Sequence, residues 1–340
     1  MRSLVTGIGG FAGSHLTDHL LAQGEEDIWG VIHRSAGHAR AFADRVHLVT
    51  VDLRDPDAVH KVFEKVQPTH VYHLAGQAFV PVSWKDPWAT LEANVRSQLN
   101  ILQALVTLGV GARVLVVGSN EEYGHVAPES LPISEEVPFR PDSPYGVSKV
   151  AQDMLGLQYF ISHQVYAVRV RPFNHIGPRQ NDRFVAASFA RQIAEIEAGL
   201  RPPIMHVGNL AAQRDFTDVR DTVRAYRLAL LRGRAGEVYN VGGGKPRPAQ
   251  EILDGLLSLS RHEIQVEEDP TRLRPADVPV SYCDPGKLRR HTGWEPSIPF
   301  EQSLRDILDD WRGRIAAPES ADKRIGRGAE HALCQKGLER

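Results

Sequence analysis

A glycine-rich turn between an apolar strand and an amphipathic helix constrains the fold of this chain more than any other feature. Residues 3–6 have the composition of a short strand, Gly7-Ile8-Gly9-Gly10-Phe11-Ala12-Gly13 follows, and residues 14–23 have a helical pattern. Glycines at such a turn let the backbone approach a pyrophosphate, which then faces the N–H groups of the helix. This context predicts a dinucleotide-binding unit.

Two registers of a phosphate-binding fingerprint fit the turn. They are Gly7-x-Gly9-x-x-Ala12 and Gly7-x-x-Gly10-x-x-Gly13, and Phe11 between the last two glycines favours the second. A purely structural glycine loop is the alternative, and the flanking strand and helix argue against it. The predicted cofactor-binding residues of the turn are Gly7, Gly9, Gly10, Phe11 and Gly13.

Predicted strands and helices alternate through the first half of the chain. Strands are predicted at residues 27–32, 46–51, 70–74, 113–117 and 165–170, and the two long helices at residues 88–108 and 143–163. Alternation of this kind indicates a parallel, doubly wound sheet. We therefore expect an α/β fold in which residues 1–170 form a Rossmann-type dinucleotide-binding domain.

The pattern changes after Arg171, where a stretch rich in proline and glycine begins. A predicted helix and a predicted strand within residues 214–243 indicate that this segment returns to the sheet. Residues 171–213 and 244–315 are predicted to form a smaller, interleaved substrate-binding domain. Residues 316–340 are polar and lack periodicity, which predicts a mobile tail.

Charge and composition exclude several classes of protein. The 340-residue chain has a net charge of −2 without a basic block, so we expect no nucleic-acid partner. It contains no apolar run of bilayer length and no recognisable secretory signal, so we expect no membrane association. Two cysteines, Cys283 and Cys334, and the absence of a Cys/His motif favour a reducing, cytoplasmic location and no metal site.

The end of the second strand predicts which dinucleotide is bound. An acid at this position would bind the ribose 2′-hydroxyl of NAD, but the sequence reads Val31-Ile32-His33-Arg34-Ser35 and supplies a cation. A guanidinium suits the 2′-phosphate of NADP, so Arg34 predicts that NADP(H) is preferred and that NAD(H) remains possible. The alternative is that Arg34 is an ordinary loop charge.

Two later strand ends add candidate cofactor contacts. Asp52 and Leu53 follow the third strand, where the acid could reach an adenine amino group or could instead cap the helix beginning near Pro56. The fourth strand runs into Leu74, Ala75, Gly76 and Gln77, where small residues let a dinucleotide lie close to the backbone.

Tyr145 and Lys149 are candidates for proton transfer. Ser143 and Pro144 predict a helix start, so Tyr145 and Lys149, four residues apart, share one helix face. We expect the ammonium of Lys149 to lower the pKa of the phenol toward the working range. The alternative is a solvated surface pair. Ser119 follows the fifth strand, at an edge where open α/β sheets place their ligands.

The glycine turn, Ser119 and the Tyr145-x-x-x-Lys149 pair together resemble the extended short-chain dehydrogenase/reductase family over residues 1–313. Within it the chain is similar to GDP-4-keto-6-deoxy-D-mannose reductases. The matching stretches include His73-Leu74-Ala75-Gly76-Gln77, Phe173-Asn174-His175-Ile176-Gly177-Pro178, Arg214-Asp215-Phe216-Thr217-Asp218 and Arg274-Pro275-Ala276-Asp277.

The resemblance implies roles for the matching residues. Tyr145 would donate a proton, Lys149 would hold the nicotinamide ribose, and Ser119 would bind the reacting sugar oxygen. His175 would line the cofactor together with residues 74–78. The sugar nucleotide, a GDP-sugar, would be bound by Asn174, Arg179, Arg214, Arg274 and Asp277.

Glu121 keeps a second activity open, because related GDP-mannose 4,6-dehydratases carry a glutamate two residues after Ser or Thr as a base at C5. Their stretch after the Asn-His motif differs from Ile176-Gly177-Pro178 here, which favours the reductase. A non-catalytic cofactor-binding protein is a third possibility, against which the intact Ser119, Tyr145 and Lys149 argue.

The two long helices predict a homodimer. Residues 88–108 place Leu91, Val95, Leu99, Leu102 and Leu105 on one stripe, and residues 143–163 place Val147, Val150, Met154 and Leu157 on another. Each helix also has apolar residues off its stripe, so the sheet covers only part of its surface. Pairing both helices with their two-fold mates would bury these stripes in a four-helix interface, as the resembled family commonly does. The alternative is cover from within the same chain.

Overall fold

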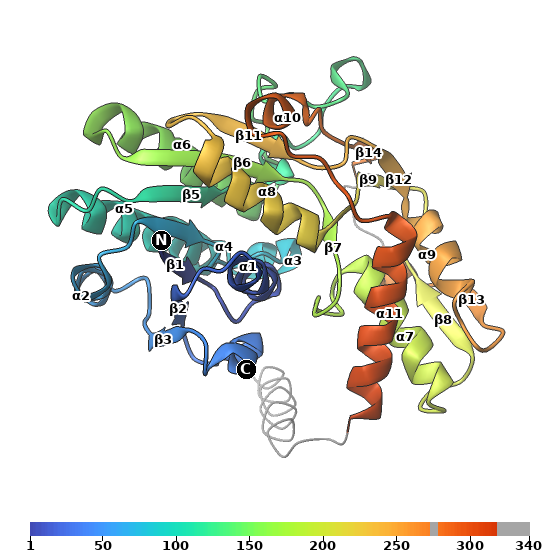
Figure 1. Ribbon diagram of the computed structural model, residues 1–340. Helices are drawn as coiled ribbons and strands as arrows, with labels where there is room; N and C mark the ends of the chain where they lie inside the picture. Colours follow the sequence, from blue (N-terminus) through green and yellow to red (C-terminus); the bar gives the residue numbers. More distant parts are fainter. Residues whose placement is uncertain (273–277, 318–340) are drawn as a thin grey trace, which may run out of the picture.

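The computed structural model describes residues 1–272 and 278–317 and contains a central sheet of seven parallel strands in the order β11-β6-β5-β4-β1-β2-β3 (Figure 1). The strands are β1 (Arg2–Thr6), β2 (Asp27–Ile32), β3 (His47–Thr50), β4 (His70–His73), β5 (Arg113–Val117), β6 (Tyr166–Pro172) and β11 (Val238–Val241). The predicted doubly wound α/β fold is confirmed. Strand order reverses between β1 and β4, and such a point is where open α/β sheets bind ligands.

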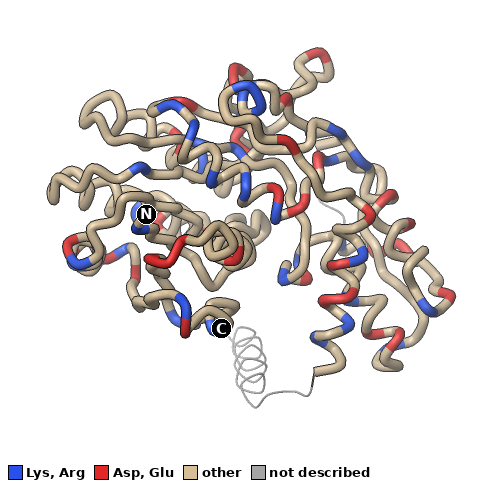
Figure 2. The backbone as a smooth tube through the Cα atoms, in the orientation of Figure 1, with Lys and Arg blue, Asp and Glu red and all other residues tan. Residues whose placement is uncertain are grey.

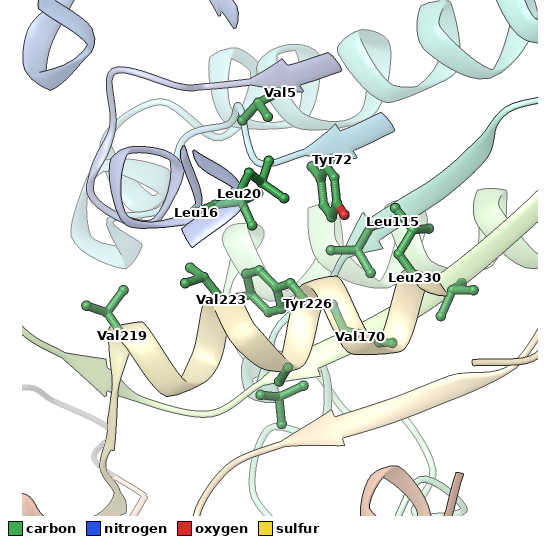
Figure 3. Packing of buried hydrophobic residues seen from close by; sticks show 14 of the residues in the cluster. Val5, Leu16, Leu20, Tyr72, Leu115, Val170, Val219, Val223, Tyr226 and Leu230 are labelled. Carbon is green, nitrogen blue, oxygen red and sulfur yellow. The ribbon is translucent and has the colours of Figure 1, made fainter. Parts of the chain in front are cut away.

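Helices cover both faces of this sheet. On one face α1 (Phe11–Ala22) and α8 (Val219–Arg232) share a core with the strands, and Figure 3 shows Leu16 and Leu20 opposite Val223 and Tyr226. On the other face α2 (Pro56–Val66), α5 (Ser97–Thr107) and α6 (Pro144–His163) pack around a second core. The sheet is buried on both sides, which explains the continuous apolar runs of its strands.

A second body of the protein has its own hydrophobic core and lies to one side of the central sheet (Figure 1). Its members are α7 (Val185–Glu197), β8 (Ile204–Val207), α9 (Ala249–Leu257), β13 (Gln265–Glu268) and α11 (Phe300–Ala316). A small sheet of β12 (Pro246–Pro248), β9 (Gln213–Asp215) and β14 (Val280–Ser281) adjoins it. The helix and strand expected to return to the central sheet are α8 and β11, whereas β9 pairs outside it.

Two elements differ from the predicted ones. Helix α1 begins at Phe11, earlier than residue 14, because Gly10 already has the extended backbone of an N-cap residue. The helix expected at residues 88–108 is instead α4 (Pro87–Leu91), the π-helical turn η2 (Glu92–Arg96) and α5. A π turn inside a helix changes the face of the helix on which the following side chains lie, and it frequently marks a functional site.

Positively and negatively charged residues are interspersed along the backbone tube in Figure 2, in keeping with the small net charge. Within residues 1–272 and 278–317, no helix combines the length and apolar character required to span a bilayer. The same residues contain no group of three or more His, Cys, Asp or Glu side chains arranged to hold a metal ion.

Candidate active site

The glycine turn after β1 is fixed by backbone contacts that leave no room for side chains. Gly7 has a φ of +69°, and a Cβ atom on Gly13 would lie 2.1 Å from the Gly7 carbonyl oxygen. A Cβ atom on Gly9 would lie 2.2 Å from the Ala36 oxygen, whereas one on Gly10 would meet nothing closer than 3.2 Å. The turn therefore requires glycine at positions from both predicted registers, and a dinucleotide pyrophosphate fits its close-approaching backbone.

Phe11 connects the glycine turn to the chain crossing after β6. Its ring stacks on His175 with centroids 5.7 Å apart and an interplanar angle of 6°, and it contacts His15 edge-on at 5.6 Å. Burial lowers the pKa of His175, so the imidazole is neutral near pH 7. The structure thus brings two predicted cofactor residues, Phe11 and His175, into direct contact.

The turn after β2 carries Arg34 and lies against the glycine turn. His38 donates its backbone N–H to the Gly9 oxygen at 3.1 Å, which ties the two turns together. Arg34 itself is exposed and forms no ion pair within the described part of the chain. Its guanidinium is therefore available next to the turn predicted to hold a pyrophosphate.

Asp52 and Leu53 both have contacts within the chain. Asp52 is paired with Arg54, whose Nη2 lies 2.7 Å from Oδ2, and this pair lowers the pKa of Asp52. The helix cap belongs to Asp55, which accepts the backbone N–H groups of residues 57 and 58, so the alternative that Asp52 caps α2 is wrong. Leu53 is a buried core residue, and its predicted contact with a cofactor stays a prediction.

Asn94, which is not among the residues predicted from the sequence, holds the loop after β4. From the π turn η2 its Oδ1 accepts the Gln77 N–H at 2.7 Å, and its Nδ2 donates to the Gln77 oxygen at 3.1 Å. The same Nδ2 donates to Ser148 Oγ at 2.9 Å. Asn94 and Gln98 stand four apart and both are buried, so they share one helix face that makes polar contacts inside the protein.

The remaining loop residues lie where the sequence predicted them. The Ala75 N–H donates to Thr6 Oγ1 at 3.1 Å, so the ends of β1 and β4 are tied together. A Cβ atom on Gly7 would be 2.8 Å from the Ala75 nitrogen, and one on Gly76 would be 2.8 Å from Asn94 Oδ1. Leu74 packs against the core. This loop and the glycine turn lie on the two sides of the point between β1 and β4 where the strand order reverses.

Ser119, Tyr145 and Lys149 come together at the carboxyl edge of the sheet. Tyr145 and Lys149 are nearly buried on α6, and the Lys149 ammonium lies 5.9 Å from the centre of the Tyr145 ring. The ammonium donates to the Val117 oxygen at 2.9 Å and to Gln152 Oε1 at 2.8 Å. The predicted surface-pair alternative is therefore wrong, since both side chains lie inside the site.

The pKa of Tyr145 moves in the direction opposite to the prediction. Burial raises the pKa of the phenol, and a hydrogen bond with Ser119 offsets only part of that effect. Burial also lowers the pKa of Lys149 to about 8, while the nearby Glu122 carboxyl opposes this shift. The prediction failed because it counted the neighbouring ammonium and not the cost of ionising a phenol away from water.

Two glutamates follow Ser119 in the short turn η3 (Asn120–Glu122). Ser119 caps this turn by accepting the Glu121 N–H at 3.2 Å. The charge of the Glu121 carboxylate raises the pKa of Tyr145, and its predicted role as the base of a dehydratase stays a prediction. Glu122 is fully buried behind Ser119 and was not singled out from the sequence.

The residues predicted to bind the substrate differ in the contacts that they make. The Asn174 Oδ1 atom is buried without a hydrogen-bond partner within the described residues, which fits a position facing a ligand. Arg214 Nη1 donates to the Val278 oxygen at 2.6 Å and so ties β9 to the chain before β14. Arg179 is paired with Asp18 of α1 at 2.7 Å, and its predicted contact with the substrate stays a prediction. Arg274 and Asp277 lie outside the described residues.

The doubly wound sheet, the glycine turn and the buried Ser119, Tyr145 and Lys149 define an NAD(P)-dependent enzyme of the short-chain dehydrogenase/reductase type. The sequence profile of the family described as GDP-mannose 4,6 dehydratase matches residues 4–307. The chain belongs to this family.

Individual relatives include both activities considered above. GDP-6-deoxy-D-mannose reductase of Pseudomonas aeruginosa is 39% identical over 317 residues, which cover 92% of this chain and 98% of the relative. GDP-mannose 4,6 dehydratase 2 of Arabidopsis thaliana is 31% identical over 327 residues, covering 91% and 86%. The resemblance stated from the motifs is therefore confirmed.

Solved structures agree with this assignment. RMD from Pseudomonas aeruginosa, complexed with NADPH, aligns with a TM-score of 0.80 at 37% identity, covering 92% of this chain and 100% of its own. UDP-glucose 4-epimerase of Thermus thermophilus, complexed with NAD, aligns with a TM-score of 0.83 at 34% identity, covering 92% and 99%.

Proposed function

We propose that this protein is an NADPH-dependent reductase acting on the C4 ketone of GDP-4-keto-6-deoxy-D-mannose, with a GDP-6-deoxyhexose such as GDP-D-rhamnose as product. The observation that carries the proposal is the 39% identity to a GDP-6-deoxy-D-mannose reductase along 92% of the chain. The assembled Ser119, Tyr145 and Lys149 support it, because a ketone reduction requires a proton donor and an oxygen-binding group at one place.

The cofactor supplies hydride when bound, and the chain supplies position and a proton. The glycine turn and the Ala75 loop would hold the dinucleotide against their backbone, and the exposed Arg34 would bind the 2′-phosphate. Because burial raises the pKa of Tyr145, the phenol is protonated at neutral pH, which is the form a reduction consumes. Ser119 holds the phenol and would share the substrate oxygen with it.

The dehydratase is retained as the second candidate because of Glu121. Its carboxylate lies close enough to Tyr145 to raise the phenol pKa, so a base is present at the site. A dehydratase requires such a base to remove the C5 proton before water leaves C6. The family itself is described by this activity.

One assay separates the two candidates. The protein is mixed with NADPH and GDP-4-keto-6-deoxy-D-mannose, and the absorbance of the reduced cofactor is followed. We expect one NADPH to be consumed for each keto-sugar. Unchanged absorbance, together with conversion of GDP-mannose to the keto-sugar under catalytic NADP, would replace the reductase with the dehydratase. The C4 configuration of the product, assigned by NMR, then identifies the sugar.

We also propose that the enzyme is a homodimer through α6 and the helices packed beside it, α3 (Val80–Lys85) and α4. Val147, Met154 and Ile161 of α6 are 46%, 37% and 63% exposed. Trp84 and Trp88 are 61% and 72% exposed. An apolar surface of this kind favours a partner. The stripe predicted on residues 88–108 is only partly available, because Leu102 and Leu105 are core residues on the sheet side of α5.

A further inference from the structure

A carboxyl group is enclosed directly behind the serine of the site. The Glu122 side chain is 0% exposed, and its Oε1 atom accepts the backbone N–H of Ser119 at 2.8 Å. The carboxyl lies against the backbone of the preceding residues, since a Cβ atom on Gly118 would be only 2.1 Å from Oε1. Glycine at position 118 thus leaves the space that Glu122 occupies.

The second oxygen of Glu122 faces a cluster of buried charges. Oε2 lies 3.1 Å from Arg171 Nε, whose N–H is directed at Asp153 Oδ2 at 3.0 Å. Asp153 also binds Arg169. The charged and titratable groups that face Glu122 are therefore Asp153 and Lys149 of α6, Arg171 of β6, and the phenols Tyr123 and Tyr145.

We propose that Glu122 is a positioning residue for the reductase reaction, which acts through Ser119 and Lys149. Through Oε1 it fixes the backbone of Ser119, so that the serine hydroxyl keeps its place at Tyr145. Through its charge it keeps Lys149 protonated at alkaline pH. The inference rests on the proposed function, because it concerns the same reduction.

The effect of Glu122 on Lys149 follows from the directions in which the pKa values of the two residues are shifted. Burial and the neighbouring Asp153 raise the pKa of Glu122, so its proton leaves only as the pH rises above neutrality. Burial lowers the pKa of Lys149 to about 8, and Glu122 is the group that opposes this loss. As Glu122 becomes anionic, it favours the ammonium form of Lys149 over the same pH range. Without Glu122, Lys149 would lose its proton at a lower pH.

A purely structural role for Glu122 predicts something different. Ser119 and Glu122 form a capping box around η3, and a capping acid alone contributes to local stability. Capping does not require a fully buried acid beside an arginine and a lysine, which costs desolvation energy. A cap also leaves the titration of Lys149 unchanged, so the pH dependence of turnover separates the two roles.

The test is the pH profile of kcat/KM for NADPH in Glu122→Gln, which keeps an acceptor for the Ser119 N–H and removes the charge. We expect the alkaline limb to move to lower pH by roughly one unit, as loss of a neighbouring opposite charge implies. Glu122→Asp, which keeps the charge, should return the limb toward that of the wild type. A limb at the wild-type pH in Glu122→Gln would overturn the inference.

Glu135→Gln is the matched control. Glu135 is a partly buried acid whose pKa is also raised by burial, and its Oε1 accepts the Asn240 N–H at 2.8 Å. It does not contribute to the shift of Lys149, so its variant should leave the limb in place. Equal movement in both variants would show that any buried-acid change alters the profile and would also overturn the inference.

Gly118→Ala tests whether Glu122 fixes the position of Ser119. This variant also replaces Glu122→Gln as the test if Glu122→Gln does not fold. The added methyl group displaces the Glu122 carboxyl from Ser119, so kcat should fall roughly ten- to a hundredfold while NADPH affinity is kept. Unchanged kcat would remove the positional role. Failure of the wild type to consume NADPH would instead overturn the proposed function. In that case the pH dependence of Lys149 acetylation by acetic anhydride, read by mass spectrometry, still tests the effect of Glu122.

Discussion

Asn94 Nδ2 donates a hydrogen bond to Ser148 Oγ at 2.9 Å and thereby joins the π turn η2 to the helix that carries Tyr145 and Lys149. Ser148 Oγ in turn donates a hydrogen bond to the backbone carbonyl oxygen of Tyr145 at 2.7 Å. Because Asn94 also binds both backbone groups of Gln77, one side chain couples the cofactor loop to the proton-transfer helix.

Asn94→Ala should therefore destabilise the protein and weaken cofactor binding together. It leaves the Gln77 N–H without its acceptor, which costs about 1–3 kcal/mol. Denaturant unfolding and NADPH titration measure the two effects. Gln103→Ala on the exposed side of α5 is the control and should stay within about 0.5 kcal/mol of the wild type. If Asn94→Ala is destabilised but binds NADPH with wild-type affinity, then Asn94 does not contribute to cofactor binding through the loop at Gln77.

Tyr145→Phe should reduce kcat by about a hundredfold or more, because the phenol is the only proposed proton donor. NADPH binding should change little, since the ring and the Lys149 contacts remain. Stopped-flow assays and fluorescence titration of NADPH provide the two values. Normal turnover in Tyr145→Phe would remove Tyr145 from the mechanism.

Arg34→Ala should raise the KM for NADPH roughly ten- to a hundredfold and that for NADH far less, because only NADPH carries the 2′-phosphate. Steady-state kinetics with each cofactor give the comparison. Arg45→Ala, an exposed arginine farther along the same region, is the matched control and should leave both values in place. Equal increases for the two cofactors would mean that Arg34 does not contact the phosphate.

Gly9→Ala should weaken NADPH binding more than Gly10→Ala. The new methyl group at residue 9 would lie 2.2 Å from the Ala36 oxygen and push away the turn that carries Arg34, whereas at residue 10 the nearest atom is 3.2 Å away. Isothermal titration of both folded variants with NADPH tests this order. If Gly10→Ala weakens NADPH binding more than Gly9→Ala, then a phosphate contact at Gly10 is more important for binding than the space beside Gly9.

Met154→Glu should convert the proposed dimer into monomers by placing a charge in its apolar interface. Leu200→Glu is the control, because Leu200 is 68% exposed at the end of α7, away from α6. Light scattering at micromolar concentration should give the mass of two chains for the wild type and the control, and of one for Met154→Glu. A wild-type mass of one chain would rule out the dimer.

Local sequence was sufficient wherever a pattern is repeated or a backbone constraint is absolute. The strands of the sheet and the helix at residues 143–163 were predicted closely, because apolar runs and the Ser143–Pro144 helix start are local signals. The glycine turn was predicted for the same reason, since no other residue fits beside the backbone there. The motif positions then placed Ser119, Tyr145 and Lys149 at one edge of the sheet.

Only the tertiary structure decided how these groups behave. The direction of the Tyr145 pKa shift depends on burial, which comes from elements distant in sequence, and no spacing of Tyr145 and Lys149 reports it. Arg179 and Glu122 likewise received their partners, Asp18 and Arg171, from the fold, whereas Asp52 pairs with Arg54 only two residues away. Apolar periodicity determines secondary structure, whereas the electrostatics of a site depend on solvent exclusion and on which charges the packed chain brings together.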